Sequence, residues 1–331
     1  MRITKPSYFD SFQCLAGACP DSCCQEWDVQ VDEESAAFYR TLPGDLGDRL
    51  RQVLKTEDCE TVMQIENRRC PMWRGDGLCR IQAELGHDAL CKTCRDFPRL
   101  THDYGNFTEL GLELSCPEAA RLILTSPIMP AAVTDLPGGE APEYDGEAMD
   151  ILLRTRAKVL ALLQNTIYSP NQALILLLYY GYQAQAELDG LDAPDFVPEH
   201  ILSHVQDVAK NGSVPEMLNF LGSLEILTDR WANRIRQSLP PHPWTEEFRR
   251  LACYFVERYW LQAVSDYDLI CRVKLAVISC IILRNLGGDL LQTAQLYSKE
   301  IENDADNVDA LFDAAYSHLA FTDEKLLFLL L

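Results

Sequence analysis

The second half of the chain repeats apolar residues at helical spacing. In EAMDILLRTRAKVLALLQN, residues 147–165, the apolar residues lie near one broad face, which predicts an amphipathic helix. Pro170 stands at the first-turn position of a second predicted helix over 171–188, and Thr245 is a candidate N-cap for a third over 244–264. Similar patterns predict helices over 267–286, 288–302 and 308–321.

The first half of the chain has a less regular pattern. WDVQVD, residues 27–32, alternates and predicts a short strand, and helices are expected over 34–42, 47–56, 79–86 and 116–126. Residues 127–147 contain four prolines and three glycines without a periodic apolar pattern, which is typical of a linker or a long surface loop. The pattern therefore predicts a mainly α protein, with an irregular N-terminal half (1–126) packed on a helical C-terminal half (148–331).

Composition and charge narrow the classes of partner. Of the 331 residues 47% are hydrophobic, but the formal net charge is −21. Nucleic acids and anionic membranes attract positive charge, so neither is an expected partner, whereas a basic, lysine-bearing protein segment is. The start of the chain does not resemble a secretory signal, and the apolar stretch 275–283 is too short to span a bilayer. These features predict a cytoplasmic location, where thiols stay reduced.

Cysteines are concentrated in the first half, which holds ten of the 13. Disulfides, a metal site and a nucleophilic thiol are the three possible reasons. A reducing location and an odd number of cysteines disfavour disulfides, and a nucleophile needs a partner base, whereas only His87 and His102 lie in this half. Thiolates select zinc, copper(I) or iron–sulfur clusters, so the pattern favours a sulfur-ligated zinc or iron–sulfur site over a metal-free thiol-rich fold. Cys253, Cys271 and Cys280 lie in apolar helical patterns and are expected in the core.

The adjacent pair Cys23–Cys24 raises a geometric question. Side chains of neighbouring residues in an extended backbone point to opposite faces, so both thiols reach one centre only through a tight turn. We therefore expect only one of the two to bind the metal.

Four motifs in order carry a resemblance to a known family. They are PSYFDSFQCLAGACPDSCCQEWDVQVD, CPMWRGDGLCRIQAELG, CKTCRDFPR and LELSCPEAARLIL, within residues 5–125. Together they resemble the flagellin lysine-N-methylase family, and the first half is also similar to cysteine-rich zinc- or iron-chelating domains. The resemblance implies S-adenosylmethionine-dependent methyl transfer to flagellin lysines and a four-iron (4Fe-4S) cluster, with zinc as the alternative metal. It implies as metal ligands the motif cysteines Cys14, Cys19, Cys23, Cys24, Cys70, Cys79, Cys94 and Cys116, and leaves Cys59 and Cys91 outside the set.

Methyl transfer to lysine places demands on the site. The amine, with an ordinary pKa of about 10.4, must lose a proton before it attacks a methyl sulfonium. Candidate proton acceptors are Tyr8, Asp21, Tyr104, Glu113 and Glu118. Candidate partners for the cofactor carboxylate are Arg95, Arg99 and Arg121. The sequence has no G-x-G-x-x-G motif after a strand, so a Rossmann-type cofactor fold is not expected.

Two other functions remain open from the residues. One is a non-enzymatic zinc- or iron–sulfur-binding module for electron transfer or partner docking. The other is a purely structural zinc site that stabilises a half with little apolar surface to bury.

Overall fold

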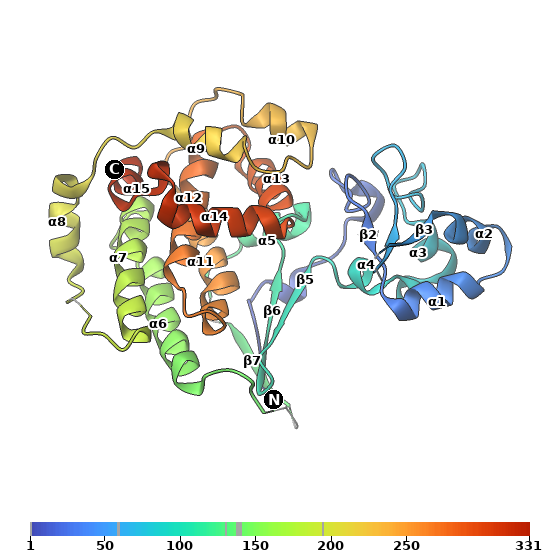
Figure 1. Ribbon diagram of the computed structural model, residues 1–331, viewed down its shortest axis with the longest axis horizontal. Helices are drawn as coiled ribbons and strands as arrows, with labels where there is room; N and C mark the ends of the chain where they lie inside the picture. The colour runs from blue at the N-terminus through green and yellow to red at the C-terminus, as the bar shows by residue number, and fades with distance from the viewer. Residues whose placement is uncertain (1, 58–59, 130, 137–140, 194) are drawn as a thin grey trace.

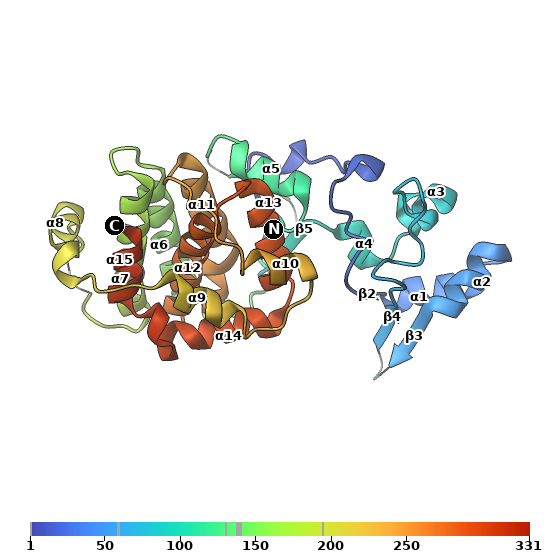
Figure 2. The ribbon, with the colours of Figure 1, turned by 90° about the horizontal axis from the view of Figure 1, so that it is seen from above.

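The computed structural model describes residues 2–57, 60–129, 131–136, 141–193 and 195–331. The fold is mainly α, which confirms the predicted class. Figures 1 and 2 show a helical body and a smaller part that projects from it. We call this smaller part, residues 13–97, the cysteine lobe. The chain enters the lobe after the 3-10 turn Phe9–Ser11 and returns to the body before strand β5, so two chain segments connect the parts.

The helical body is built around one central helix, α12 (Ile270–Leu286). This helix is apolar on all sides and buried along nearly its whole length, as expected for a helix surrounded by others. Its neighbours are α7 (Pro170–Leu188), α9 (Val214–Leu221), α11 (Glu246–Tyr259), α13 (Leu290–Ile301), α14 (Ala305–Ser317) and α15 (Asp323–Leu330). Helix α6 (Gly146–Gln164) packs against α7 and α11 (Figure 1). Cys253, Cys271 and Cys280 are buried, which confirms their predicted place in the core. Among the helices of the described residues, none is both long enough and apolar enough to traverse a bilayer.

Most predicted helices of the second half are confirmed, with shifted ends. The pattern over 244–264 extends beyond α11, which ends at Tyr259 and continues as a 3-10 turn, Trp260–Val264. Three short helices were not expected from the pattern: α8 (Pro198–Val208), α9 (Val214–Leu221) and α10 (Asp229–Arg234). They pack on the outside of the body and bury few residues, namely Val205 in α8, Met217 and Leu221 in α9 and Trp231 in α10.

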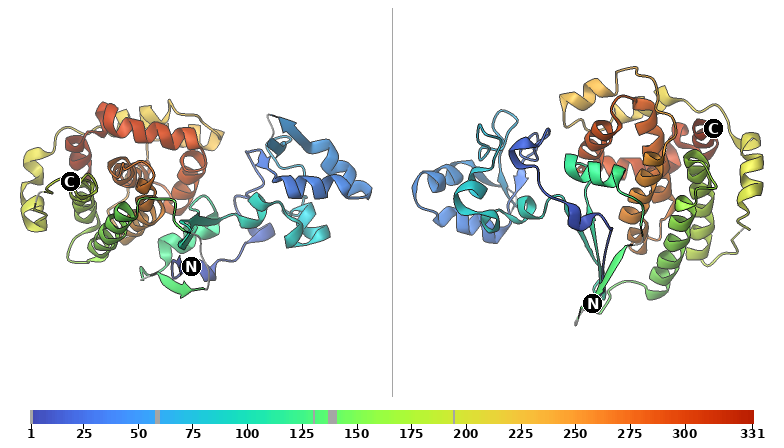
Figure 3. Two further views of the ribbon diagram at one scale, coloured as in Figure 1. Left: turned by 60° about the horizontal axis from the view of Figure 1, so that its bottom comes forward. Right: turned by 180° about the vertical axis from the view of Figure 1, so that it is seen from behind.

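A four-stranded sheet in the order β5-β6-β1-β7 lies beside the helices (Figure 3) and was not predicted. Its strands are β1 (Arg2–Lys5), β5 (Arg99–Asp103), β6 (Phe107–Leu112) and β7 (Ala132–Asp135). Strand β1 pairs in parallel with β6, with Arg2 opposite Phe107, and antiparallel with β7. These partners are more than a hundred residues apart, so a local periodicity cannot reveal them. Strand β7 also makes part of the expected linker an edge strand.

The buried apolar side chains of the first half belong to two different cores, and the division lies near residue 98. Phe107, Leu114 and Ile123 belong to the core of the helical body, so strand β6 and helix α5 (Pro117–Thr125) pack with the second half of the chain. The domain boundaries at 126 and 147 stay a prediction. The clusters of buried side chains nevertheless group residues 99–125 with the body rather than with the cysteine lobe.

The cysteine lobe has a small core of its own. It contains the helices α1 (Glu33–Thr41), α2 (Gly44–Val53), α3 (Arg80–Leu85) and α4 (Lys92–Asp96) and a sheet in the order β2-β4-β3. The strands are β2 (Val29–Gln30), β3 (Leu54–Glu57) and β4 (Glu60–Met63). Tyr39, Leu50 and Met72 are fully buried there, together with the thiols of Cys70 and Cys91. Buried and partly buried thiols thus pack among the apolar side chains of this core.

A buried lysine of the body joins the two parts. Lys299 in α13 is 1% exposed, and its Nζ lies 3.6 Å from Asp21 and 3.5 Å from Glu26 of the lobe. The same ammonium lies 4.4 Å from the centre of the Trp27 ring, a cation–π contact. Because a buried charge is costly unless it is paired, these contacts hold the lobe against α13.

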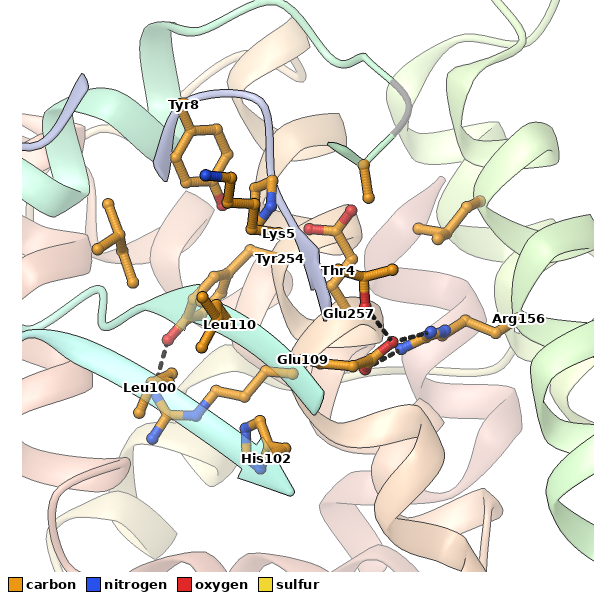
Figure 4. A pocket seen from close by; sticks show the side chains of 16 residues that line it. Thr4, Lys5, Tyr8, Leu100, His102, Glu109, Leu110, Arg156, Tyr254 and Glu257 are labelled. Carbon is orange, nitrogen blue, oxygen red and sulfur yellow. Dashed lines mark hydrogen bonds and ion pairs between the residues drawn. The ribbon is translucent and has the colours of Figure 1, made fainter. Parts of the chain in front are cut away.

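A cavity of about 100 Å³ separates the four-stranded sheet from helices α6 and α11 (Figure 4). Arg156 forms an ion pair with both carboxylate oxygens of Glu109 in its wall. Glu257 also lines the cavity, and within the described part of the chain its carboxyl has no hydrogen-bond or ion-pair partner. Burial raises the pKa of Glu257 to about 7; Glu109 adds to the rise and Arg156 opposes it.

We expect Glu257→Gln to stabilise the protein more at high pH than at low pH. The folded pKa lies above the unfolded value, so ionisation of Glu257 costs stability as pH rises toward 7. The advantage of the variant should grow by about 2 kcal/mol between pH 5.5 and 8.5, measured by urea unfolding. Glu199→Gln, at an exposed position on α8, is the control. An advantage that does not change with pH would contradict the assignment.

We expect Lys299→Met to lower the free energy of unfolding by about 3 kcal/mol, because Asp21 and Glu26 lose their shared partner. The matched control is Lys210→Met, which removes an exposed lysine paired with Glu324 and should cost less than about 1 kcal/mol. Urea unfolding monitored by circular dichroism measures both. Equal costs for the two variants would show that the buried ion pairs do not hold the lobe.

Candidate metal and substrate site

Seven of the eight motif cysteines line one cavity of about 310 Å³. They are Cys14, Cys19, Cys23, Cys24, Cys79, Cys94 and Cys116. The eighth, Cys70, is buried in the lobe core, where its thiol contacts the sulfur of Met63 at 3.4 Å. Cys91 is buried in the same core, and Cys59 lies outside the described residues. The structure therefore gathers cysteines that lie up to 102 positions apart in the sequence.

Local structure explains how several thiols reach the cavity. Cys79 and Cys116 each stand at the N-cap position of a helix, which ends an extended segment and begins α3 or α5. Two glycines let the loops that carry the other thiols approach closely. A Cβ on Gly77, whose φ is +79°, would lie 3.2 Å from Gly17, so the segment near Cys14 and Cys19 packs directly on the segment before Cys79.

The chain turns at Cys23–Cys24, and the two thiols are hydrogen bonded to each other. The backbone here is therefore not extended, and both side chains line the cysteine cavity. That only one of the two binds a metal stays a prediction. The Cys23 hydrogen bond lowers the pKa of Cys24 to about 7, and the same bond raises the pKa of Cys23. Since the thiolate is the ligating form, Cys24 is the more readily ionised member of the pair.

Cys91 and Cys94 form a second hydrogen-bonded pair, which lowers the pKa of Cys91 and raises that of Cys94. Burial raises the pKa of Cys70 to about 12 and of Cys116 to about 11. Buried thiols with raised pKa values ionise only when a cation compensates the charge, and a bound metal is such a cation.

The cysteine thiols are suitable ligands for a thiophilic metal, but they are not arranged around a single ion. Among the described residues, no group of three or more Cys, His, Asp or Glu side chains is arranged to hold a metal ion. A tetrahedral zinc site needs four ligand atoms within about 2.3 Å of the ion. The cysteine cavity instead spreads its thiols around a larger space, and the metal-binding role of the first half stays a prediction.

A second opening, a cleft of about 610 Å³, lies between the cysteine lobe and the body. It shares Cys23, Cys94 and Phe97 with the cysteine cavity, so the two spaces meet at these residues. The cleft is acidic. Its carboxylates are Asp28 from the lobe and Glu113, Glu302, Asp304 and Asp306 from the body.

A buried polar network forms the wall of this cleft. Glu302 accepts hydrogen bonds from Tyr259 at 3.0 Å and from Tyr254 at 3.1 Å, and it lies 3.3 Å from Arg258. Arg258 is also 4.0 Å from Glu113. Burial raises the pKa of Glu113, while Arg258 opposes that rise. Glu113 is therefore a nearly buried carboxyl that faces the cleft beside two cysteines.

The five predicted proton acceptors lie at four different places. Asp21 and Glu118 line the cysteine cavity, and Glu113 lines the cleft. Tyr8 lines the cavity between the sheet and the helices (Figure 4), and Tyr104 stacks on Phe107 at 4.7 Å, so neither tyrosine is placed beside the thiols. The structure does not bring these two together with the other three.

Two of the three predicted arginines also line the cysteine cavity. They are Arg95, which lies 3.9 Å from Asp96, and Arg99, which lies over the Phe12 ring at 5.1 Å. Arg121 instead pairs with both oxygens of Glu118, at 2.6 and 2.8 Å.

Sequence reasoning missed the polar residues that α13 contributes to this region. Gln295 donates to Asp21 at 2.9 Å and to the Ser115 carbonyl at 2.7 Å, one turn before Lys299. Glu302 follows three positions later. The sequence pattern that could have revealed them is a polar stripe: Gln295, Lys299 and Glu302 are spaced four and three positions apart, which places them on one face of a helix that is otherwise buried.

Comparisons with known proteins point to one family. The chain is 32% identical over 132 residues to a flagellar biosynthetic protein FliU of Salmonella muenchen, a match that covers 38% of this chain and 78% of FliU. It is also 32% identical over 132 residues to a lysine-N-methylase of Salmonella typhimurium and 33% identical to one of Salmonella choleraesuis.

The chain matches about a third of the length of those two methylases, 33% in each case. No family model and no solved structure matches the chain. The ordered cysteine motifs and the extent of the FliU match together show that this chain belongs to the flagellin lysine-N-methylase family.

Proposed function

We propose that this protein is an S-adenosylmethionine-dependent lysine N-methyltransferase that acts on flagellin, with an iron–sulfur cluster held by its N-terminal cysteines. Family membership supports a lysine-methylating activity, and the name FliU connects the family to the flagellum. The observation that carries the proposal is the meeting of an acidic cleft with a thiol-lined cavity at Cys23 and Cys94.

The acidic cleft suits a lysine side chain as substrate. Its carboxylates attract an ammonium group, and Trp27 and Phe97 supply flat apolar walls for an aliphatic chain. The chain as a whole, at −21, also attracts a basic segment from a distance. A lysine that enters this cleft approaches the cysteine cavity with its amine.

Glu113 is the proposed proton acceptor. Its carboxyl is nearly buried in the cleft wall, and burial raises its pKa toward that of a useful base. When the amine transfers its proton to Glu113, the nitrogen lone pair becomes free to attack the methyl carbon. The carbon–sulfur bond then breaks, and the thioether product leaves with that electron pair.

The cysteine cavity is the proposed place of the cluster. A thiolate-bound cluster supplies electron-transfer or ligand-binding chemistry, and its potential depends on burial and hydrogen bonds to sulfur. Arg95 and Arg99 line the same cavity and would balance the charge of a negative cluster or pair with a carboxylate of the methyl donor. The second candidate is a non-enzymatic metal module. The thiol-lined cavity supports it equally, but it gives no role to the acidic cleft.

Metal analysis tests the cofactor. Purified without oxygen, the full chain should be brown and contain iron and acid-labile sulfide in equal amounts. Cys253→Ser, which changes a buried thiol of the helical body, should leave the metal content unchanged. A colourless protein with stoichiometric zinc would overturn the iron–sulfur assignment.

Methylation of flagellin tests the activity and the cleft. With S-adenosylmethionine and a matched flagellin, mass spectrometry should detect methyl groups on lysines. We expect Glu113→Gln to lower kcat about 100-fold, the usual contribution of a general base. Asp304→Asn combined with Asp306→Asn should raise KM several-fold at low salt while kcat stays the same, because these carboxylates only attract the substrate.

Asp309→Asn combined with Asp313→Asn is the matched control, since it removes the same two charges from exposed positions of α14 outside the cleft. If it raises KM as much as the cleft variant does, general charge rather than the cleft attracts flagellin. If the metal-loaded wild-type protein transfers no methyl groups, the enzyme assignment fails and the metal module becomes the better description.

A further inference from the structure

The Glu257 carboxyl of α11 lines the cavity between the four-stranded sheet and helices α6 and α11, which we call the sheet cavity (Figure 4). It has no hydrogen-bond or ion-pair partner in the described part of the chain. Cations that line the same cavity are engaged elsewhere, since Arg156 donates to Glu109 at 2.7 Å and Lys5 lies 2.6 Å from Asp10. An enclosed carboxylate of this kind is costly unless a cation joins it.

Glu257 also borders a smaller cavity of about 30 Å³. Arg250 lines that space, but its guanidinium donates to the carbonyls of Leu124 at 3.1 Å and Ser126 at 2.9 Å. The Cys253 thiol, one turn before Glu257, is neutral because burial raises its pKa. From the described residues on this side, too, Glu257 thus receives no cation of its own.

The sheet cavity is separate from the acidic cleft. Arg258 and Tyr254 line the sheet cavity, and both contact Glu302 in the wall of the cleft, at 3.3 Å and 3.1 Å. They therefore form a partition between the two spaces. Among the described residues, none that lines the sheet cavity also lines the cleft or the cysteine cavity.

Apolar side chains form much of the remaining wall of the sheet cavity. They are Pro6 after β1, Leu100 of β5, Leu110 of β6 and Leu160 of α6. A cavity of about 150 Å³ accepts benzene, so the volume of about 100 Å³ leaves room for about four non-hydrogen atoms. Such a space fits a short alkyl chain, which gains free energy when it is buried against apolar walls.

We propose that the sheet cavity binds a primary ammonium group on a short alkyl chain, with the ammonium against the Glu257 carboxylate and the alkyl chain between the leucine side chains. An ammonium needs several hydrogen-bond acceptors, and the hydroxyl of Tyr8 in the same wall adds one to the carboxylate oxygens. Two sources present this chemistry, a free small amine and the end of a lysine side chain. The site uses neither a metal nor a methyl donor, so it goes beyond the proposed function and does not rest on it.

Isothermal titration calorimetry of the full chain with n-propylammonium chloride tests the site, because this cation matches the room in the cavity. We expect saturable binding with a Kd of about 1 mM, a realistic affinity for so small a ligand. Neutral 1-propanol has the same size without the charge. It should bind about tenfold more weakly, because it forms no ion pair with Glu257.

Two variants separate the contribution of the carboxylate from that of the cavity. Glu257→Gln should weaken propylammonium binding about tenfold and leave propanol binding unchanged. Gly111→Val should abolish the binding of both, because Gly111 and Leu100 are paired across two strands and line the cavity together. A Cβ at Gly111 would lie 3.7 Å from the Leu100 side chain, an ordinary contact, and circular dichroism checks that the variant is folded.

The controls remove carboxylates elsewhere. They are Glu199→Gln at an exposed position of α8 and Asp304→Asn combined with Asp306→Asn in the cleft. Both should bind propylammonium as the wild type does. If the cleft variant loses as much affinity as Glu257→Gln, the ligand binds by general charge or in the cleft, and the inference is overturned.

Propylammonium affinity should rise about tenfold from pH 6 to pH 8. The pKa of Glu257 is raised to about 7, so its carboxyl ionises over this range, whereas an alkylammonium, with an ordinary pKa of about 10.4, stays charged. The other titratable groups of the wall keep their charge, because burial lowers the pKa of His102 and raises the pKa values of Tyr8 and Tyr254. In Glu257→Gln the rise should disappear.

Competition with a short acetylated peptide that contains one lysine distinguishes the two sources. Displacement of propylammonium assigns a lysine side chain as the ligand, and lack of displacement assigns a free amine. If the wild type shows no saturable binding up to about 50 mM propylammonium, or if both Glu257→Gln and Gly111→Val bind it unchanged, the inference fails. Since neither methyl donor nor flagellin is present, that failure is distinct from a failure of the proposed methyl transfer.

Discussion

The structure depends on one buried ammonium group. Lys299 lies in a helix of the body, yet its partners Asp21, Glu26 and Trp27 all come from the lobe. Desolvating a lysine is costly, and only the complete set of partners offsets this cost. The lobe segment that carries Cys19, Cys23 and Cys24 is consequently held in one position against α13. Both the cysteine cavity and the acidic cleft owe their shape to that position.

The lobe itself illustrates a second constraint. Its core is small and its helices are short, so burial alone supplies limited stability. Thiols share this interior, and burial raises the pKa of Cys70 to about 12 and also raises that of Cys79. Such thiols are neutral without a metal and become ligands when a cation enters. The same cysteines would thus contribute both to the packing of the lobe core and to the binding of a metal.

The sequence predicted those elements whose structure is determined by residues close together along the chain. Helices α6, α7 and α12 follow directly from apolar periodicity, and the cysteine motifs led to the family before any geometry was known. The sheet did not follow, because Arg2 pairs with Phe107 across most of the first half of the chain. The acidic cleft could not be predicted either, since Asp28 and Asp306 meet only through the packing of two distant segments. The turn at Cys23–Cys24 was missed because adjacent residues alone do not define a backbone conformation.

Cys116 has a mechanical consequence. It stands at the first turn of α5 in the body, whereas Cys14, Cys19 and Cys23 belong to the lobe. A ligand that binds thiols of both parts would therefore connect the lobe to the body, in addition to the two chain segments and the ion pairs that already join them.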